Sequence, residues 1–286
     1  MNLLVTGSRG QLGNELQELS LLSDYSNFKF YFSNSENLSL LDIEALQEFF
    51  KVNQINICIN CAAYTAVDKA ETEKENATLI NVDAVRNLAL VCEKNEALLV
   101  HISTDFVFDG TNNVPYKETD TTNPLSVYGS TKLEGEQQAQ ILCKNHIIIR
   151  TSWLYSHYGN NFVKTIQRLG RERDSLNIIF DQIGTPTYAY DLAKTILDIL
   201  PMYQIQYAGV YHYSNEGCGS WFDFAYEILA LSNISSKVQP IETTSYPTPA
   251  VRPKYSVLNK NKIKTSFNLQ IPYWKESLRI CLKKIS

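Results

Sequence analysis

Short runs of β-branched and aromatic residues alternate with longer amphipathic stretches along the first 180 residues. The stretches at 10–22, 45–52, 79–94 and 132–144 carry apolar residues at helical spacing. The strand-like runs between them are NLLVT (2–6), FKFYF (28–32), INICIN (55–60), LLVHIS (98–103), HIIIR (146–150) and LNIIF (176–180). Strands that alternate with helices predict an α/β fold, a Rossmann-type doubly wound parallel sheet.

The alternation loosens after residue 181, where proline and tyrosine accumulate in GTPTYAY and TTSYPTPAVRP. This pattern predicts a smaller carboxyl-terminal lobe over the edge of the sheet where ligands of such folds bind. A helix over 190–200 and the run GVYHYS at 209–214 are expected to return to the sheet. We therefore predict a sheet domain of 1–152 with 186–214, and a smaller lobe of 153–185 with 215–286.

Composition narrows the class of protein. A formal net charge of -4 and an isoelectric point near 5.7 give no positive field for nucleic acid or an anionic membrane, so neither partner is expected. Six cysteines without a basic leader, and apolar runs too short to span a membrane, predict reduced thiols in the cytoplasm. The CxxC of Cys58 and Cys61 lies in a strand-like run and indicates buried structural thiols. Metal-ligand spacing is absent from the histidines at 101, 146, 157 and 212.

Three glycines, Gly7, Gly10 and Gly13, follow the first strand-like run and open the first helix. Such a turn needs positive φ, and close approach of a pyrophosphate excludes a Cβ. The helix then offers free N–H groups and its positive dipole to the phosphates. The glycines in this context predict that the sheet domain binds a dinucleotide, and their GxxGxxG spacing resembles that of short-chain reductases.

The sequence leaves the choice between NADPH and NADH open. The end of the second strand offers Ser33, Asn34 and Ser35. No carboxylate there repels a 2′-phosphate, and no arginine is expected there to bind one. Asp42 and Ile43 are candidate adenine contacts, and a helix N-cap is the alternative reading of Asp42.

Three tyrosines stand four residues before a lysine, a spacing that puts both side chains on one helix face. The pairs are Tyr25 with Lys29, Tyr190 with Lys194, and Tyr128 with Lys132. The first is expected at the surface, and the second has no polar partner nearby in sequence. The third follows a strand-like run that delivers Thr104 and Asp105 to its carboxyl end, where a nicotinamide is expected.

A phenol, an ammonium and a hydroxyl at that position suit proton transfer coupled to hydride transfer. Tyr128 is the expected acid that protonates a carbonyl oxygen, and neighbouring positive charge is expected to lower its pKa toward neutrality. Lys132 would adjust that pKa and bind the nicotinamide ribose. Thr104 would hold the substrate oxygen. The alternative is a packed tyrosine beside a solvated lysine.

A set of motifs spans nearly the whole chain: TGSRGQLG, NCAAYTAVDKAE, STDFVFDG, VYGSTKLEGE, RTSWLYSHYGNNFVKT, DQIGTPT and YPTPAVRPKYSVLN. In this order they resemble the dTDP-4-dehydrorhamnose reductase family of extended short-chain reductases. The resemblance implies NADPH or NADH in the amino-terminal domain and a thymidine-diphospho sugar in the carboxyl-terminal lobe. It also implies reduction of the sugar's 4-keto group to give dTDP-L-rhamnose.

The same resemblance implies roles for single residues. Thr104, Tyr128 and Lys132 match the catalytic positions. The implied cofactor-binding positions are Gly10, Gln11, Leu12, Ala62, Ala63 and Tyr64. The implied substrate-side positions are Thr65, Val67, Asp68, Asp105 and Trp153, with Asn161 and Arg252 at the diphosphate.

The chain departs from the family pattern at two places. Phe106 stands where a tyrosine is more usual, which removes a hydroxyl near the sugar. Some family members dimerise around magnesium, but Tyr190 occupies a region where a second acid besides Glu15 would be sought. No metal site is assigned, and a monomer or a homodimer is expected.

Two other functions share part of this sequence pattern. Another nucleotide-sugar 4-keto reductase or epimerase would share the glycine turn and the Tyr128/Lys132 pair, but the YPTPAVRP motif argues against it. A noncatalytic regulatory subunit, like the relatives of this fold that bind methionine adenosyltransferase, need not keep Thr104, Tyr128 and Lys132 together. Catalysis is therefore preferred.

Overall fold

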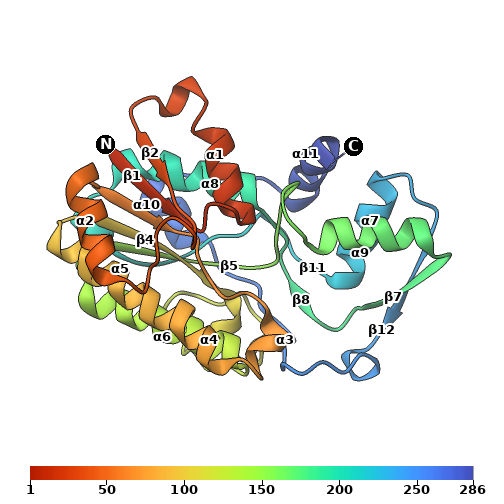
Figure 1. Ribbon diagram of the computed structural model, residues 1–286. Helices are drawn as coiled ribbons and strands as arrows, with labels where there is room; N and C mark the ends of the chain where they lie inside the picture. Colours follow the sequence, from red (N-terminus) through yellow and green to blue (C-terminus); the bar gives the residue numbers. More distant parts are fainter. Residues whose placement is uncertain (286) are drawn as a thin grey trace.

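The computed structural model describes residues 1–285 and is built around one large parallel sheet (Figure 1). Six strands lie in the order β10-β5-β4-β3-β1-β2, and all neighbours run parallel. Their bounds are β1 (Asn2–Thr6), β2 (Lys29–Phe32), β3 (Ile57–Asn60), β4 (Leu98–Thr104), β5 (His146–Thr151) and β10 (Gly209–His212). The predicted Rossmann-type α/β fold is confirmed.

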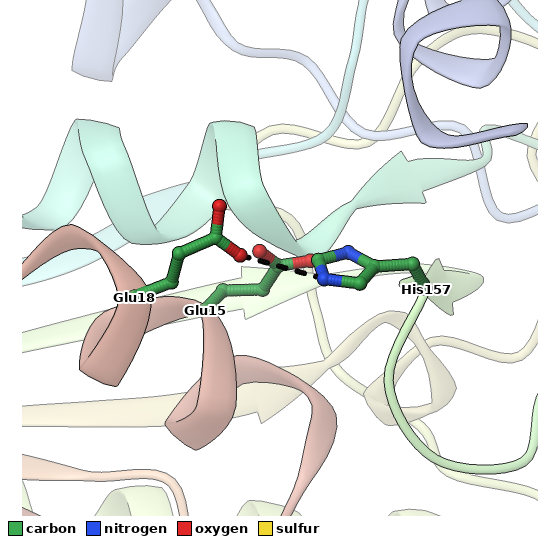
Figure 2. Close-up of side chains that lie close together, drawn as sticks. All are labelled: Glu15, Glu18 and His157. Carbon is green, nitrogen blue, oxygen red and sulfur yellow. Dashed lines mark ion pairs between the residues drawn. The ribbon is translucent and has the colours of Figure 1, made fainter. Parts of the chain in front are cut away.

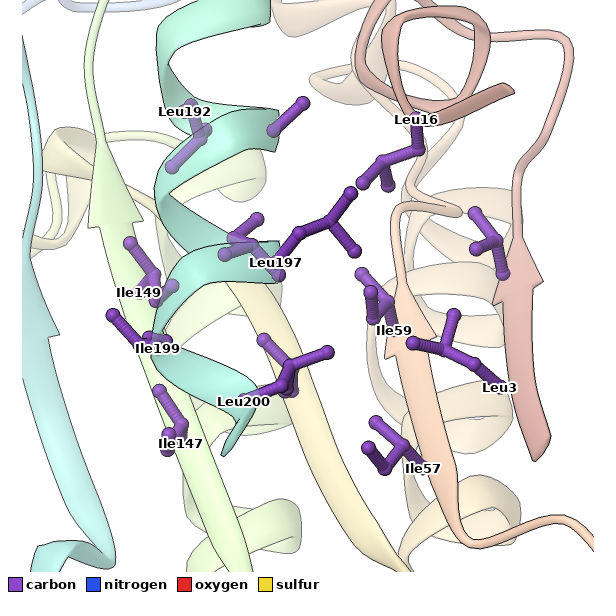
Figure 3. Packing of buried hydrophobic residues seen from close by; sticks show 14 of the residues in the cluster. Leu3, Leu16, Ile57, Ile59, Ile147, Ile149, Leu192, Leu197, Ile199 and Leu200 are labelled. Atoms are coloured by element: carbon purple, nitrogen blue, oxygen red, sulfur yellow. The ribbon is translucent and has the colours of Figure 1, made fainter. Parts of the chain in front are cut away.

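Helices cover both faces of this sheet. Successive residues of each strand point to opposite faces, and they are apolar on both. Leu3 and Val5 of β1 belong to one buried cluster, and Leu4 between them belongs to another. The first face packs against α1 (Gln11–Leu19), α8 (Ala189–Ile199) and α10 (Asn261–Phe267). Figure 3 shows Leu16, Leu192 and Leu197 of this layer over the strand residues. The second face packs against α2 (Ile43–Asn53), α5 (Ala84–Lys94) and α6 (Val127–Leu142).

A smaller lobe has its own core beyond the end of the sheet (Figure 1). Its helices are α7 (Phe162–Glu172), α9 (Trp221–Leu231) and α11 (Trp274–Ile285). The strand-like run at 176–180 forms most of β7 (Ser175–Ile179), which pairs with β12 (Lys237–Ile241) and does not extend the large sheet. The run at 209–214 contains β10 and does return to that sheet. The domain limits given above stay a prediction.

Short elements complete the chain. They are η1 (Ser23–Tyr25), α3 (Val67–Ala70), α4 (Lys74–Thr78), η2 (Leu79–Asp83), η3 (Asp105–Val107), β6 (Leu154–Tyr155), β8 (Ile183–Gly184), β9 (Thr187–Tyr188), η4 (Leu200–Met202), η5 (Ile205–Tyr207), β11 (Gly219–Ser220) and η6 (Thr243–Ser245). Within residues 1–285, every helix is too short or too polar to cross a membrane. Within residues 1–285 the cysteines are free. The prediction of two buried thiols is right for Cys58 only: Cys61 is half-buried, and burial raises the pKa of its thiol.

Candidate active site

The turn after β1 packs its glycines against neighbouring backbone. Gly7 has φ +66°, and a Cβ there would lie 2.6 Å from the Ala62 nitrogen. A Cβ on Gly13 would lie 2.5 Å from the Gly7 carbonyl oxygen, so neither position accepts a side chain. A Cβ on Gly10 would meet only that carbonyl, at 3.2 Å. Gly10 is also the N-cap of α1 and gives no side-chain cap, which leaves the first amides of α1 available to an anion.

A cavity of about 480 Å³ lies beside this turn. Its walls include Gly7 and Gly10, the segment 33–35 after β2 and the segment 61–63 after β3. This volume suits a large part of a dinucleotide. Ala62 and Ala63 are wall residues, whereas Leu12 is buried in the core and can offer a ligand only its backbone.

Arg9 is a cation at this cavity that sequence reasoning missed. The Ser8 amide donates to the Ser33 carbonyl at 3.0 Å, which holds the glycine turn against the end of β2. Arg9 therefore lies in the same wall as Ser33 and Asn34, where it binds the Glu36 carboxylate through two nitrogens. The expectation that no arginine is available there is wrong, because the neighbours of β2 in space come from the turn after β1.

Asp42 and Ile43 begin α2 and do not belong to the cavity wall. Asp42 is the N-cap and accepts a hydrogen bond from the Ala45 amide at 2.9 Å, so the capping alternative is the one present. Ile43 packs against the buried cluster on that face of the sheet. Leu40 and Leu41 are the wall residues of this segment. An adenine contact of Asp42 stays a prediction.

Tyr128 and Lys132 lie in the first turns of α6, at the carboxyl end of β4. Ser126 caps the helix by accepting from the Gly129 amide at 3.1 Å, which fixes its start. Lys132 is buried, and its ammonium donates to the Ile102 carbonyl at 2.7 Å. Burial lowers the pKa of Lys132 to about 8.

The Tyr128 phenol lies close enough to the Thr104 side chain for Thr104 to act on its pKa, so these two predicted catalytic residues come together. Burial raises the pKa of Tyr128 to about 12, although the contact with Thr104 acts in the opposite direction. The expectation that the ammonium lowers this pKa toward neutrality is wrong for the chain itself, because burial dominates and Lys132 donates to a carbonyl. Tyr128 is thus a phenol at neutral pH, the form that donates a proton.

The other two tyrosine–lysine pairs serve packing. Tyr25 is buried, contrary to its expected surface position, and its hydroxyl donates to the Asp198 carboxylate at 2.9 Å. Lys194 binds the same carboxylate at 2.6 Å. The Tyr190 ring lies 4.8 Å from the Lys284 ammonium. Tyr25 and Tyr190 therefore contact Asp198 and Lys284, respectively, in place of a catalytic hydroxyl.

Asn81 is a second residue that the sequence did not reveal. It is fully buried in η2, a π-helical turn. Its side chain accepts from the Tyr64 amide at 2.9 Å and donates to the Tyr64 carbonyl at 3.2 Å and the Thr131 hydroxyl at 3.1 Å. Asn81 therefore fixes the segment after β3 to α6, the helix that carries Tyr128. π-Helical turns often occur at functional sites, but nothing in LINVDAV signals one.

Predicted substrate-side residues come together from distant parts of the sequence. Asp68 in α3 binds Arg252 through two nitrogen–oxygen contacts, at 2.7 and 3.0 Å, so the two are partners of each other. Thr65 lies just before α3 and is exposed. Val67 is the first residue of α3 and is half-buried.

Asn161 is engaged by the protein itself. It caps α7 by accepting from the Lys164 amide at 3.2 Å. Its amide donates to the Ser156 carbonyl at 2.6 Å and to the Gln11 side chain at 2.9 Å. Gln11 and Asn161 thereby join the glycine turn to the smaller lobe, and any contact with a diphosphate would have to replace one of these bonds.

Asp105 is buried next to Thr104, which donates to it at 3.1 Å. Burial raises the pKa of Asp105 to about 6, and the neighbouring Ser256 and Thr104 hydroxyls act in the opposite direction. Phe106, the departure noted in the sequence, packs edge-on against the Tyr128 ring with centroids 5.6 Å apart. A change at this position therefore reaches the predicted acid directly.

The side chains of Glu15, Glu18 and His157 lie close together and are the candidate ligands for magnesium (Figure 2). Glu15 is fully buried and accepts from the Ser156 hydroxyl at 2.6 Å; burial raises its pKa to about 7. His157 offers nitrogen, and Lys284 donates to Glu18 at 2.6 Å. Only two of the three candidate ligands are carboxylates, and the Lys284 ammonium already binds one of them, so the cluster lacks the set of oxygen ligands that magnesium takes.

The parallel sheet, the glycine turn with its cavity, and the Thr104, Tyr128 and Lys132 group define a Rossmann-type nicotinamide-dependent oxidoreductase. The chain matches the family described as RmlD substrate binding domain over residues 1–286. It belongs to this family.

Relatives agree over the full length. The dTDP-4-dehydrorhamnose reductase of Aggregatibacter actinomycetemcomitans is 40% identical, with 97% of each chain covered. A solved dTDP-4-dehydrorhamnose reductase from Clostridium acetobutylicum is 41% identical with a TM-score of 0.94, and 99% of each chain is covered. The Bacillus anthracis enzyme, solved in complex with NADP, is 39% identical with a TM-score of 0.94 and the same coverage.

Proposed function

We propose that this chain reduces the 4-keto group of dTDP-4-dehydro-6-deoxy-L-mannose with NADPH or NADH, giving dTDP-L-rhamnose. The relatives named above carry this activity in their names, and they are similar over the whole chain. The observation that carries the proposal in this structure is the approach of the Tyr128 phenol to Thr104 at the carboxyl end of β4, with Lys132 one turn further along α6.

In this mechanism the bound dihydronicotinamide supplies the hydride. Tyr128 delivers its phenolic proton to the carbonyl oxygen, so that a C–H and an O–H bond form as the C=O double bond is lost. Thr104 orients that oxygen from the other side. Lys132 would bind the nicotinamide ribose, and solvent would return the proton to the phenolate left on Tyr128.

The phosphates of the cofactor belong at the amides of α1, with Gly7, Gly10, Gln11, Leu12 and Gly13 forming the turn around them. The sugar nucleotide belongs against Thr65, Val67, Asp68, Asp105 and Trp153, with Asn161 and Arg252 toward the diphosphate. Arg252 would exchange part of its contact with Asp68 for phosphate oxygens. We also propose that the protein is a monomer or a homodimer and that it works in the cytoplasm. The free cysteines support the cytoplasmic location.

The decisive experiment follows cofactor oxidation with the 4-keto-L-sugar nucleotide, using NADPH and NADH in parallel. We expect turnover with both cofactors and dTDP-L-rhamnose as the product, identified by mass and by its C4 configuration. An epimerase would instead interconvert sugars without net cofactor oxidation. A protein that bound the cofactor tightly but gave no turnover with the sugar would be a regulatory subunit.

A further inference from the structure

Trp153 has a backbone conformation that large side chains avoid. Its φ is +48°, in the left-handed region that favours glycine. Such strain persists only where surrounding contacts over-determine the residue, and strained residues cluster at functional sites. The contacts of the Trp153 indole are therefore informative.

Two neighbours fix this indole. The Trp221 indole stacks on it, with ring centroids 3.6 Å apart and planes inclined by 11°. A Cβ on Gly184 would lie 2.6 to 2.8 Å from the Cε2, Cζ2 and Nε1 atoms of Trp153. The indole thus fills the space that any side chain at 184 would need. We call the stacked pair Trp153 and Trp221 the aromatic wall.

The local fold holds both neighbours in place. β8 and β11 pair antiparallel with Gly184 opposite Gly219, and Trp221 follows β11 directly as the first residue of α9. Ser220 and Asp223 form a capping box at this helix start. The Phe162 ring packs against Trp221 with centroids 4.6 Å apart. These contacts fix the position of Trp221 independently of Trp153.

The aromatic wall lies beyond the carboxyl ends of β4 and β5, close to the predicted catalytic residues. Thr151 of β5 is the register partner of the last residue of β4, so Trp153 follows two residues beyond that end. The Ser256 amide donates to the Ile183 carbonyl of β8 at 2.8 Å, and the Ser256 side chain lies close enough to Asp105 to act on its pKa. Ser256 thus connects β8 with the segment that carries Thr104, and neither indole belongs to the walls of the cofactor cavity.

We propose that Trp221 is a positioning residue, which holds the Trp153 indole as a fixed apolar surface for the sugar ring of the nucleotide-sugar substrate. Trp153 is only half-buried, so part of it remains open to a ligand. A 6-deoxy sugar has a C–H face and a methyl group that pack against an aromatic ring. A wall that is already rigid loses no rotamer freedom when the sugar binds. The identity of the sugar rests on the proposed function; the role of Trp221 toward Trp153 does not.

The test uses Trp221→Leu, Trp221→Phe and Gly184→Ala in the full chain. We expect Trp221→Leu and Gly184→Ala to raise KM for the sugar nucleotide by about three- to tenfold, the range that one aromatic contact supplies. kcat should stay within about threefold, and the Kd for NADPH should not change. Trp221→Phe keeps an aromatic ring and should recover most of the wild-type KM.

A second readout needs no substrate. Two stacked indoles give an exciton couplet in circular dichroism, which Trp153→Phe, Trp221→Phe and Gly184→Ala should each remove. Trp274→Phe, at the third tryptophan of the chain, should leave the couplet intact. A wild-type KM in Trp221→Leu, or equal losses in NADPH affinity and sugar affinity, would overturn the proposal. If the wild type did not turn over the sugar, the proposed function would fail, whereas the couplet would still report whether Trp153 and Trp221 are stacked.

Discussion

At the scale of single residues, Tyr128 carries the strongest prediction. Tyr128→Phe keeps the ring that packs against Phe106 but removes the proton that the mechanism delivers. General acid catalysis contributes about 10²- to 10⁴-fold, so kcat should fall by that factor while cofactor affinity and the melting temperature are retained. Steady-state kinetics and a cofactor titration measure these quantities.

Tyr190→Phe is the matched control, because it removes the same hydroxyl from a tyrosine that also precedes a lysine by four residues. Its kcat should stay within about threefold of the wild type. Retention of more than a tenth of kcat in Tyr128→Phe, or a larger loss in Tyr190→Phe, would show that the acid is a different residue.

Arg9 and Glu36 make a second prediction at this scale. Their ion pair is exposed on both sides, so a 2′-phosphate can compete with the Glu36 carboxylate for the guanidinium. Without a repelling carboxylate at 33–35, both cofactors should work within about tenfold in kcat/KM. Arg9→Gln should weaken NADPH about five- to thirtyfold and NADH less than twofold, because a charge-assisted contact is lost only with NADPH. Glu36→Gln should shift kcat/KM in favour of NADPH, because it removes the carboxylate that competes for the Arg9 guanidinium. Equal effects of Arg9→Gln on both cofactors would place the discriminating contact elsewhere.

The residues that could be predicted from sequence are those whose partners lie nearby in the chain. Tyr128 and Lys132 share a helix face, and Gly7 and Gly13 share one turn. Arg9 could not be assigned, because its neighbour Ser33 reaches it only after β1 and β2 pair in register. Asn81 was missed for the same reason, since its contacts at Tyr64 and Thr131 lie 17 and 50 residues away.

At the scale of elements, two glycines of the turn after β1 have different roles: Gly13 is needed for folding, and Gly10 is needed for cofactor binding. A Cβ on Gly13 would meet backbone of Gly7 and Ser8 at 2.5 to 2.8 Å, so Gly13→Ala should destabilise the fold by about 2 kcal/mol or more. Gly10 has more room, with one contact at 3.2 Å. Gly10→Val should therefore leave a folded protein that no longer binds the cofactor, because the side chain occupies the place of the pyrophosphate.

Chemical denaturation and cofactor fluorescence test the two variants together. Gly10→Val with unchanged cofactor affinity would contradict the phosphate assignment. Gly13→Ala with wild-type stability would show that the turn relaxes around a methyl group.

The elements themselves were largely predictable, but not all of their partners. The alternating runs correctly predicted the strands of the large sheet, because each strand is apolar on both faces. The run at 176–180 has the same composition, and its place beside β12 depends on a segment 62 residues further along the chain. Local pattern carries no information about that pairing.

At the scale of the whole molecule, Glu15 joins α1 to the loop after β6 through Ser156, and its neighbours Glu18 and Lys284 add α11 to the contact. The pKa of Glu15 is raised from 4.5 to about 7 by burial, so the folded state binds a proton that the unfolded state releases. The contribution of Glu15 to stability is fully present below about pH 4.5 and is lost as the pH rises through 7. The difference amounts to about 3 kcal/mol at most.

Glu15→Gln replaces the carboxyl with a neutral group of the same shape, so this part of the pH dependence should disappear. The free energy of unfolding of the wild type, minus that of Glu15→Gln, should decline between about pH 4.5 and 7 and be constant outside that window. Glu18→Gln is the control: burial acts to raise the pKa of Glu18, but its contact with Lys284 gives a net lowering, so its contribution has the opposite sign and is lost as the pH falls. Asp105, His157 and Asp191 also titrate or carry charge, but they are present in both proteins and largely cancel in the difference. A difference that is flat from pH 4 to 8 would mean that Glu15 is ionised in the folded chain, and the cluster in Figure 2 would then be a real candidate for a divalent cation after all.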